Sequence, residues 1–129
     1  MNNITINSNS NDIKEMEKLF PRAPLKIIAM EGCKELGQKV NDYIVNFRQS
    51  SYREELKSPM YATYLQGNYL VDAHCPRFGS GEAKGVLNES VRGKDLFIMT
   101  DVCNYSLTYS VNGYVNHMSP DDHYQDLKR

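Results

Sequence analysis

One turn of the chain carries an aromatic ring and a carboxylate on either side of two glycines. It reads Phe78, Gly79, Ser80, Gly81, Glu82. An exposed ring can stack on a flat heterocycle, a carboxylate can accept a hydrogen bond from an amino group, and glycine lets a ligand approach the backbone closely. The same residues also suit a plain hairpin turn with Phe78 packed in the core. The residue types alone favour this second interpretation.

A second turn, Glu89 to Gly93, places a hydroxyl close to a guanidinium. Ser90 and Arg92 can bind an anion together, because a guanidinium forks onto two oxygens and a hydroxyl donates a further hydrogen bond. An arginine and a lysine beside a glycine are equally typical of an ordinary solvated turn. The residues leave both interpretations open.

Histidines and carboxylates gather near the end of the sequence, at His117, Asp121, Asp122 and His123. Such residues can form a metal site. Helix capping explains the acids better, because a serine and a proline precede them in the order that begins a helix, and acids favour the first helical turn. We therefore predict no metal site in this segment.

Two other chemistries are not indicated. The turn Glu31 to Lys34 opens a helix, but the chain has neither GxGxxG nor GxxxxGK[ST], so we interpret it as a structural turn rather than a phosphate loop. His74 and Cys75 are adjacent in a predicted strand, so their side chains point to opposite faces. We predict no Cys and His nucleophilic pair and no catalytic residue.

The elements that must position these turns are strands and helices in alternation. The run Leu25 to Met30 is apolar and predicts a buried strand. From Lys34, apolar residues recur at spacings of three and four, which predicts one apolar face of an amphipathic helix; they are Leu36, Val40, Tyr43, Ile44 and Phe47.

Two short strands, Tyr69 to His74 and Ala83 to Ser90, are predicted to form a hairpin around the glycine-rich turn. The run Asp95 to Thr100 has the continuous apolar character of a strand covered on both faces. A parallel sheet with helices outside fits this order best.

The other segments are less regular. Residues 1–24 are polar and predict an extension with a short helical piece, Ile13 to Phe20. Residues 48–67 are interpreted as an insertion, and 101–118 as a long tyrosine-rich loop. A helix is predicted from Pro120 and has no stop signal before Arg129, so we expect it to be cut short.

Composition limits the function classes. A chain of 129 residues fits one domain, and its net charge of -1 gives no general attraction to nucleic acid or acidic membranes. The odd set of Cys33, Cys75 and Cys103 fits reduced thiols in or near the core. We find neither a secretion signal nor a membrane-spanning run in the sequence, and expect a cytoplasmic protein.

Three strings resemble one enzyme family: ELGQKV from Glu35, FGSGEAKGVLNESVRGKDLFIM from Phe78 to Met99, and DLKR from Asp126. The chain resembles the N-terminal half of ribose-phosphate pyrophosphokinases, as a divergent member. The resemblance implies a phosphoribosyltransferase-like (Rossmann-like) α/β domain over residues 25–129. It has a parallel sheet flanked by helices and an inserted β-hairpin. Family members carry a second such domain, and the resemblance covers none of it.

The resemblance also implies an activity and its sites. The family transfers diphosphate from ATP to ribose 5-phosphate with Mg²⁺, and this half alone is expected to be inactive and to hold neither cofactor tightly. Phe78, Ser80 and Glu82 would contact the adenine of ATP in a neighbouring subunit, although the family often has Asp or Asn at the position of Ser80. Ser90 and Arg92 would contact a regulatory phosphate between subunits of a dimer or hexamer.

Two alternatives stay open. The chain could be a regulatory or oligomerisation module that binds full-length relatives without catalysis. A more remote alternative is an unrelated nucleotide-binding domain, which would need a phosphate loop after Met30.

Overall fold

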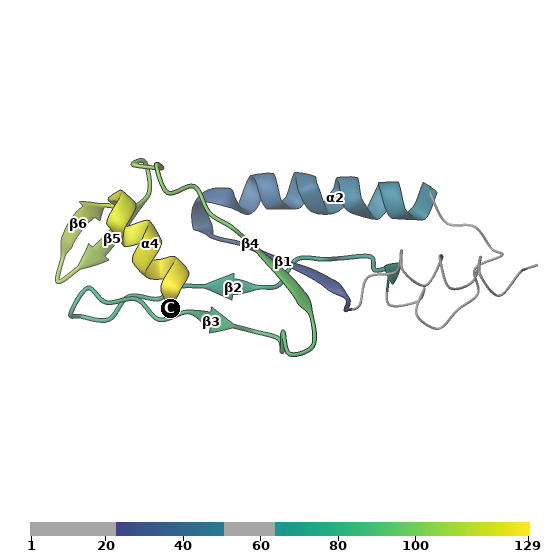
Figure 1. Cartoon of the computed structure of the whole chain (residues 1–129). Helices are drawn as coiled ribbons and strands as arrows, with labels where there is room; N and C mark the ends of the chain where they lie inside the picture. The colour runs from purple at the N-terminus through teal and green to yellow at the C-terminus, as the bar shows by residue number, and fades with distance from the viewer. Residues whose placement is uncertain (1–22, 51–63) are drawn as a thin grey trace, which may run out of the picture.

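The computed structural model describes residues 23–50 and 64–129. The predicted helical piece Ile13 to Phe20 and most of the predicted insertion lie outside these residues. The described chain is an α/β structure with a small parallel sheet and two α-helices, seen in Figure 1. No helix among the described residues is both long and apolar enough to cross a bilayer.

The centre of the fold is a parallel pair of strands. Strand β1 (Leu25–Ala29) pairs with β4 (Asp95–Met99), with partners from Leu25↔Asp95 to Ala29↔Met99. On the other side of β1, the backbone N–H of Ile27 donates to the carbonyl of Tyr69 and that of Val71 donates to Ile27, both at 2.8 Å. The predicted first strand and the parallel pairing are confirmed.

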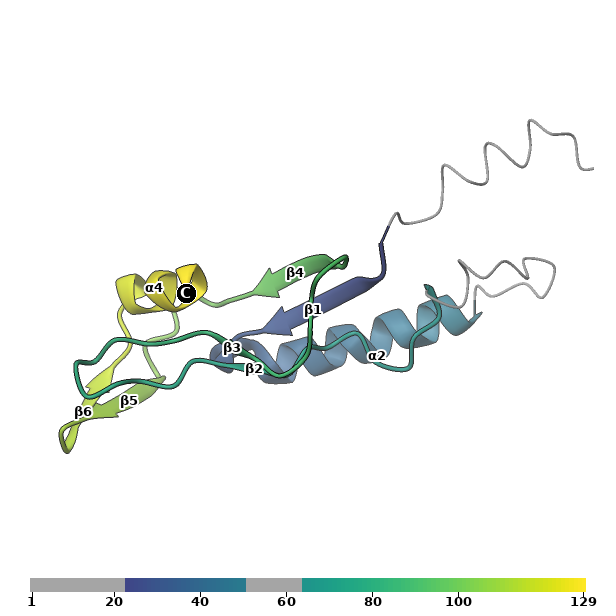
Figure 2. The same ribbon diagram turned by 90° about the horizontal axis from the view of Figure 1, so that it is seen from below.

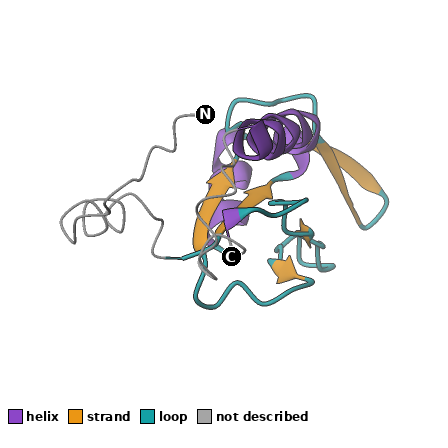
Figure 3. Ribbon diagram, turned by 90° about the vertical axis from the view of Figure 1, so that its right-hand side faces the viewer, coloured by secondary structure: helices purple, strands orange, loops and turns teal. Residues whose placement is uncertain are grey.

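Helix α2 (Lys34–Ser50) follows the 3₁₀ turn η1 (Glu31–Cys33) and lies on one side of the strands, as Figure 3 shows. A Cβ placed on Gly37 would lie 2.5 Å from the Cβ of Ala29, so only glycine allows this close approach of helix to strand. One turn later, the buried side chain of Asn41 accepts a hydrogen bond from the Tyr69 backbone at 2.8 Å.

An amphipathic helix usually packs its apolar face against the core, but three members of the predicted apolar face of α2 are exposed. Leu36, Tyr43 and Phe47 are exposed by 54%, 71% and 55%. The packed face instead carries Gly37 and Asn41, because a small residue and a hydrogen bond bring the helix close to β1. The three exposed residues lie beside that face, and the rings of Tyr43 and Phe47 stack with centroids 6.3 Å apart.

The predicted hairpin is present as a long two-stranded ribbon, but its strands are shorter than predicted, because Tyr69 and Val71 hydrogen-bond to Ile27 of β1 instead. Strand β2 (Ala73–His74) pairs antiparallel with β3 (Val86–Leu87), and an isolated bridge joins Arg77 to Ala83. The same register extends to both ends, because Asn88 donates to the carbonyl of Asp72 at 3.0 Å and Phe78 donates to that of Glu82 at 2.8 Å. We call residues 72–88 the ribbon.

The prediction that β4 is covered on both faces is wrong. Phe97 is 61% exposed and Ile98 is 45% exposed, and these neighbours point to opposite faces. Within residues 23–50 and 64–129, β4 pairs with β1 along one edge. The apolar run therefore marks surface that the described residues leave uncovered.

The long loop predicted at 101–118 is in part a second hairpin. Strand β5 (Thr108–Val111) pairs antiparallel with β6 (Tyr114–His117). The two residues between them have positive φ, 51° at Asn112 and 83° at Gly113, as the tight turns of two-residue hairpins require. Figure 2 shows this hairpin beside α4 at one end of the molecule.

Helix α4 (Pro120–Lys128) begins where the sequence predicts. The Ser119 hydroxyl accepts from the backbone N–H of Asp122 at 3.2 Å, and the Asp122 carboxylate accepts from the backbone N–H of Ser119 at 2.8 Å. Two backbone donors that the helix cannot use are satisfied reciprocally.

Candidate functional site

The tip of the ribbon is a tight turn, residues 78–82. The backbone N–H of Phe78 donates to the Glu82 carbonyl at 2.8 Å, and that of Gly81 donates back to the Phe78 carbonyl at 2.9 Å. Gly81 has φ of 86°, a conformation that favours glycine. The Phe78 side chain is 54% exposed, so the interpretation that buries its ring in the core is wrong.

The polar residues of this turn differ in their surroundings. Ser80 is exposed. Glu82 is also exposed, but its Oε1 accepts from the guanidinium of Arg129, at the end of α4. Arg129 also donates to the Ala83 carbonyl at 3.1 Å. The turn is thus tied to the last residue of the chain.

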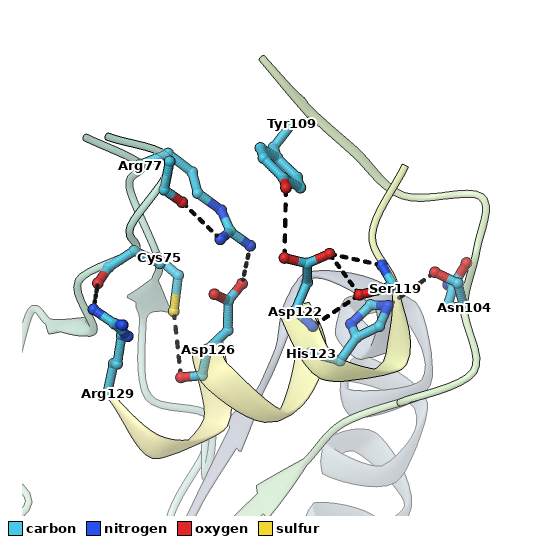
Figure 4. Close-up of polar contacts among 11 residues, drawn as sticks. Cys75, Arg77, Asn104, Tyr109, Ser119, Asp122, His123, Asp126 and Arg129 are labelled. Atoms are coloured by element: carbon cyan, nitrogen blue, oxygen red, sulfur yellow. Dashed lines mark hydrogen bonds and ion pairs between the residues drawn. The ribbon is translucent and has the colours of Figure 1, made fainter. Parts of the chain in front are cut away.

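Arg77, immediately before the turn, contacts three elements at once (Figure 4). Its Nη1 donates to the Gly81 carbonyl at 3.1 Å, and its Nη2 donates to Oδ2 of Asp126 in α4 at 3.0 Å. Its guanidinium lies 4.2 Å from the ring centroid of Tyr109 in β5. The Arg77 and Asp126 side chains are only 12% and 9% exposed, so their ion pair is largely shielded from water.

The second oxygen of Asp126, Oδ1, is buried and has no hydrogen-bond partner among the described residues. Burial raises the pKa of Asp126, and the charge of Asp122 adds to this, while Arg77 acts in the opposite direction. Burial and the nearby Asp126 also raise the pKa of the Cys75 thiol.

Asp122 behaves differently although it lies one helical turn away. Burial acts to raise its pKa, but hydrogen bonds from the backbone and side chain of Ser119, the charge of Arg77 and the hydrogen bond from Tyr109 together outweigh burial, so that the pKa is lowered. The hydroxyl of Tyr109 also donates to Asp122 Oδ1, at 3.5 Å. Tyr109 thus contacts both Arg77 and the cap of α4.

A small cavity of about 130 Å³ opens beside this cluster. It lies at the carboxyl ends of β1 and β4, where open α/β sheets commonly bind ligands. Its walls include Gly32, Asp101, Tyr109, His123 and Asp126.

The second predicted turn lies at the other end of the ribbon. Lys94 donates to the Val91 carbonyl at 3.2 Å, Gly93 has φ of 70°, and the backbone N–H of Arg92 donates to Ser90 Oγ at 3.4 Å. Ser90 and Arg92 are therefore close together, and both are exposed. The two predicted sites are separated, because an extended segment from Glu82 to Glu89 spans roughly 20 Å.

The two histidines near the end of the chain make hydrogen-bond contacts within the fold. Nδ1 of His117 lies 2.9 Å from the Tyr105 carbonyl, and Nε2 of His123 lies 2.9 Å from the Asn104 carbonyl. His117 lies in strand β6 rather than in a loop. The described ranges contain no group of three or more His, Cys, Asp or Glu side chains that could hold a metal.

The three cysteines have different environments and form no disulfide with one another. Cys33 is buried, as predicted, and Cys75 is half-buried. Cys103 is exposed, so the prediction of a position in or near the core is wrong for this residue. It lies in the turn before β5, where its backbone N–H donates to Asp101 at 3.1 Å.

Sequence reasoning missed Arg77, Tyr109 and Asp126. Arg77 directly precedes the FGSGE string and Asp126 begins the DLKR string, so both lay within or beside the motifs. Their pairing joins segments 49 residues apart, which no local pattern shows. Tyr109 falls within the predicted loop 101–118, but it lies in strand β5.

The described chain is a small α/β domain. Its ribbon lies between the two parallel strands in the sequence, and both predicted turns are exposed. A family model described as the N-terminal domain of ribose phosphate pyrophosphokinase matches residues 25–128, most of the chain. The chain belongs to this family of pyrophosphokinase N-terminal domains. No curated protein and no solved structure matches the chain.

Proposed function

We propose that this chain is the N-terminal domain of a ribose-phosphate diphosphokinase, which converts ATP and ribose 5-phosphate to phosphoribosyl pyrophosphate and AMP. In this proposal its 78–82 turn contacts the adenine of ATP bound to a neighbouring subunit. The observation that carries the proposal is the exposed Phe78 ring on a hydrogen-bonded turn, within a segment matched by the family model.

The chemistry of the turn supports adenine as its ligand. An exposed aromatic ring offers the flat apolar face on which a purine stacks. Glu82 already accepts from Arg129, yet a carboxylate has about four acceptor sites and can bind a further amino group. Ser80 is short, so its contact with the base would run through a water molecule.

The second turn supports a phosphate contact. Ser90 and Arg92 lie in one exposed turn, with Lys94 two residues further on. The neighbouring acid, Glu89, is paired with Lys26 at 3.5 Å, which reduces its repulsion of an anion. This proposal makes Ser90 and Arg92 the contacts to a regulatory phosphate between subunits.

The proposed domain is not catalytic alone. Mg²⁺ would arrive bound to the phosphates of ATP, because this ion is usually held by substrate phosphates together with one or two carboxylates. Positioning and charge neutralisation supply most of the rate in phosphoryl transfer, and the proposal places those groups in the second domain. We expect the purified chain to form no AMP from ATP, Mg²⁺ and ribose 5-phosphate.

Association into a homo-oligomer is part of the proposal. Apolar side chains of Leu36, Tyr43, Phe47, Phe97 and Ile98 are exposed on α2 and β4, and exposed apolar patches commonly mark interaction sites. The same observation supports the alternative, a non-catalytic module that binds full-length relatives. Light scattering with and without a catalytically complete relative distinguishes them, since the alternative requires a mixed complex.

A calorimetric titration with ATP and ADP tests the adenine contact. Phe78→Ala should weaken binding by a factor of roughly 5 to 150, the usual effect of losing one base-stacking ring. Tyr124→Ala is the matched control, because Tyr124 is an aromatic residue about as exposed as Phe78 (49% and 54%) but lies on α4, outside the apolar surface of α2 and β4. Equal affinities of the parent and Phe78→Ala would refute the adenine contact, provided that light scattering shows an oligomer.

A further inference from the structure

The 78–82 turn needs support from outside itself. Two backbone hydrogen bonds close it, between Phe78 and Glu82 and between Gly81 and Phe78. Gly79 and Gly81 are permissive residues, and the tip of an isolated two-stranded ribbon is marginally stable in water. A ring on such a turn would sample many directions unless neighbouring elements fixed it.

Helix α4 and the β5–β6 hairpin supply this support. Arg77 links the Gly81 carbonyl to Asp126 in α4 and stacks on Tyr109 in β5. Asn112, at the tip of the second hairpin, donates from Nδ2 to the Gly79 carbonyl at 3.4 Å.

Arginine suits the central position better than any other cation. Its planar fork can donate in two directions while its flat face rests on an aromatic ring, whereas a lysine ammonium lacks both the fork and the face. The partner, Asp126, is held on a helix whose start is fixed by the capping box of Ser119 and Asp122. A rigid helix therefore anchors the guanidinium, and the guanidinium anchors the turn.

We infer that Arg77 is the positioning residue of the 78–82 turn, holding the Phe78 ring in one orientation with the help of the β5–β6 hairpin. Arg77 itself does not touch the nucleotide. The inference deepens the proposed function and rests on it for the identity of the ligand. The orientation of the ring, however, can be measured without any ligand.

The chain contains no tryptophan, so Phe78→Trp places a single fluorescent reporter on the turn. In this background we compare the parent with Arg77→Gln, Arg77→Lys and Asn112→Ala. Lys84→Gln is the matched control, because it removes an exposed cation from the same ribbon. Acrylamide quenching and fluorescence anisotropy are measured without nucleotide, well below the unfolding temperature.

Arg77→Gln leaves Asp126 buried without its counter-charge, which can unfold a small domain. The double variant Arg77→Gln with Asp126→Asn removes that charge, and Asp126→Asn alone serves as its control. Circular dichroism confirms that each variant is folded before the fluorescence is interpreted.

We expect lower anisotropy and stronger quenching of the introduced tryptophan in the Arg77→Gln variants, and a smaller change in the same direction for Asn112→Ala. Arg77→Lys should restore the parent values only in part, and Lys84→Gln should match the parent. With Phe78 intact, Arg77→Gln should weaken ATP binding roughly fivefold or more, because a mobile ring must be ordered on binding and a hydrogen bond is lost.

Folded Arg77→Gln variants in which the introduced tryptophan is no more mobile than in the parent would overturn the inference. The role of Arg77 and the proposed function can be contradicted independently of each other. Equal ATP affinities of the parent and Phe78→Ala would contradict the adenine contact of the proposed function, while the mobility comparison still decides the role of Arg77. Full rescue by Arg77→Lys would show that charge alone acts, and would overturn the role of the planar fork.

Discussion

Asp122 and Asp126 lie one turn apart on the same helix and have pKa values shifted in opposite directions. Burial raises the pKa of Asp126, whereas hydrogen bonds and the charge of Arg77 lower that of Asp122. Asp122 accepts from the backbone and side chain of Ser119, whereas one oxygen of Asp126 is buried without a partner in the described chain. The two acids should therefore make opposite contributions to the pH dependence of stability.

The raised pKa of Asp126 means that the folded state binds its proton more tightly than the unfolded state. Its contribution is fully present below 3.8, the ordinary pKa, and is lost as pH rises through the folded-state pKa. We predict that the stability of the parent relative to Asp126→Asn falls as pH rises above 3.8. Urea unfolding over a pH series measures this, and a constant difference would contradict it.

The lowered pKa of Asp122 has the reverse consequence. Its contribution is present above 3.8 and is lost as pH falls through the folded-state pKa. The stability of the parent relative to Asp122→Asn should therefore fall in acid. The same urea series provides the test, and the two variants act as controls for each other because they share a helix.

Ser119 offers a simpler test at a single residue. Ser119→Ala removes the oxygen that accepts from the backbone of Asp122. The free energy of unfolding should fall by about 1 kcal/mol, the usual cost of losing a helix cap. Ser119→Thr keeps an acceptor and should lose less. Denaturant midpoints at neutral pH measure both, and equal losses would count against the cap.

Some features of the 78–82 turn could be predicted from the sequence, and others could not. The string FGSGE predicted a turn, and a turn was found with Phe78 at its surface. The residue types could not predict that Glu82 pairs with Arg129, because the two are 47 positions apart. Long-range ion pairs depend on how distant elements pack, and no short segment of the sequence determines that packing.

At the scale of elements, the close approach of α2 to β1 depends on Gly37. A methyl group at this position would meet the Cβ of Ala29 at 2.5 Å. Gly37→Ala should cost about 1 to 3 kcal/mol of stability, as overpacking of a tight contact usually does. The gain in helix propensity, up to about 1 kcal/mol, offsets part of this cost. Thermal unfolding measures the balance.

Gly67→Ala is the matched control for this prediction. Gly67 has no atom within 4 Å of the position of an added Cβ, so its substitution should change stability by no more than about 0.5 kcal/mol. If Gly37→Ala reduced stability as little as Gly67→Ala, helix α2 would have room to move away from strand β1.

The elements with strong local signals were predictable. The first strand, the ribbon, the parallel pairing and the start of α4 all follow the patterns of apolar runs and capping residues. The β5–β6 hairpin had an equally good signal, Asn112 followed by Gly113 between alternating residues, which is typical of a two-residue hairpin. Because its strands are polar, rich in tyrosine and without a buried face, the segment resembles a loop in composition.

For the whole molecule, the described core is small and is centred on Tyr69, which is fully buried. Its hydroxyl donates to the Tyr64 carbonyl at 2.7 Å, and its backbone N–H donates to Asn41. Tyr69→Ala should reduce stability by about 3 kcal/mol or more, as loss of a buried aromatic ring does. Tyr43→Ala removes the same atoms from a side chain that is 71% exposed, and should cost far less.

Urea unfolding of these two tyrosine variants tests where the core lies. A similar loss in both would mean that the exposed face of α2 is covered when the protein is in solution. Sequence patterns could not settle this question, because an apolar stripe has the same periodicity whether its own chain or another surface covers it.

The constant register of the ribbon constrains how this lineage can change in length. Every pairing from Asp72 with Asn88 to Phe78 with Glu82 follows one alignment, so inserting one residue in one strand would turn all later side chains to the opposite face. Related genes should therefore gain or lose codons here in balanced sets, with equal numbers in both strands. An unbalanced change should appear only together with a bulge that absorbs it.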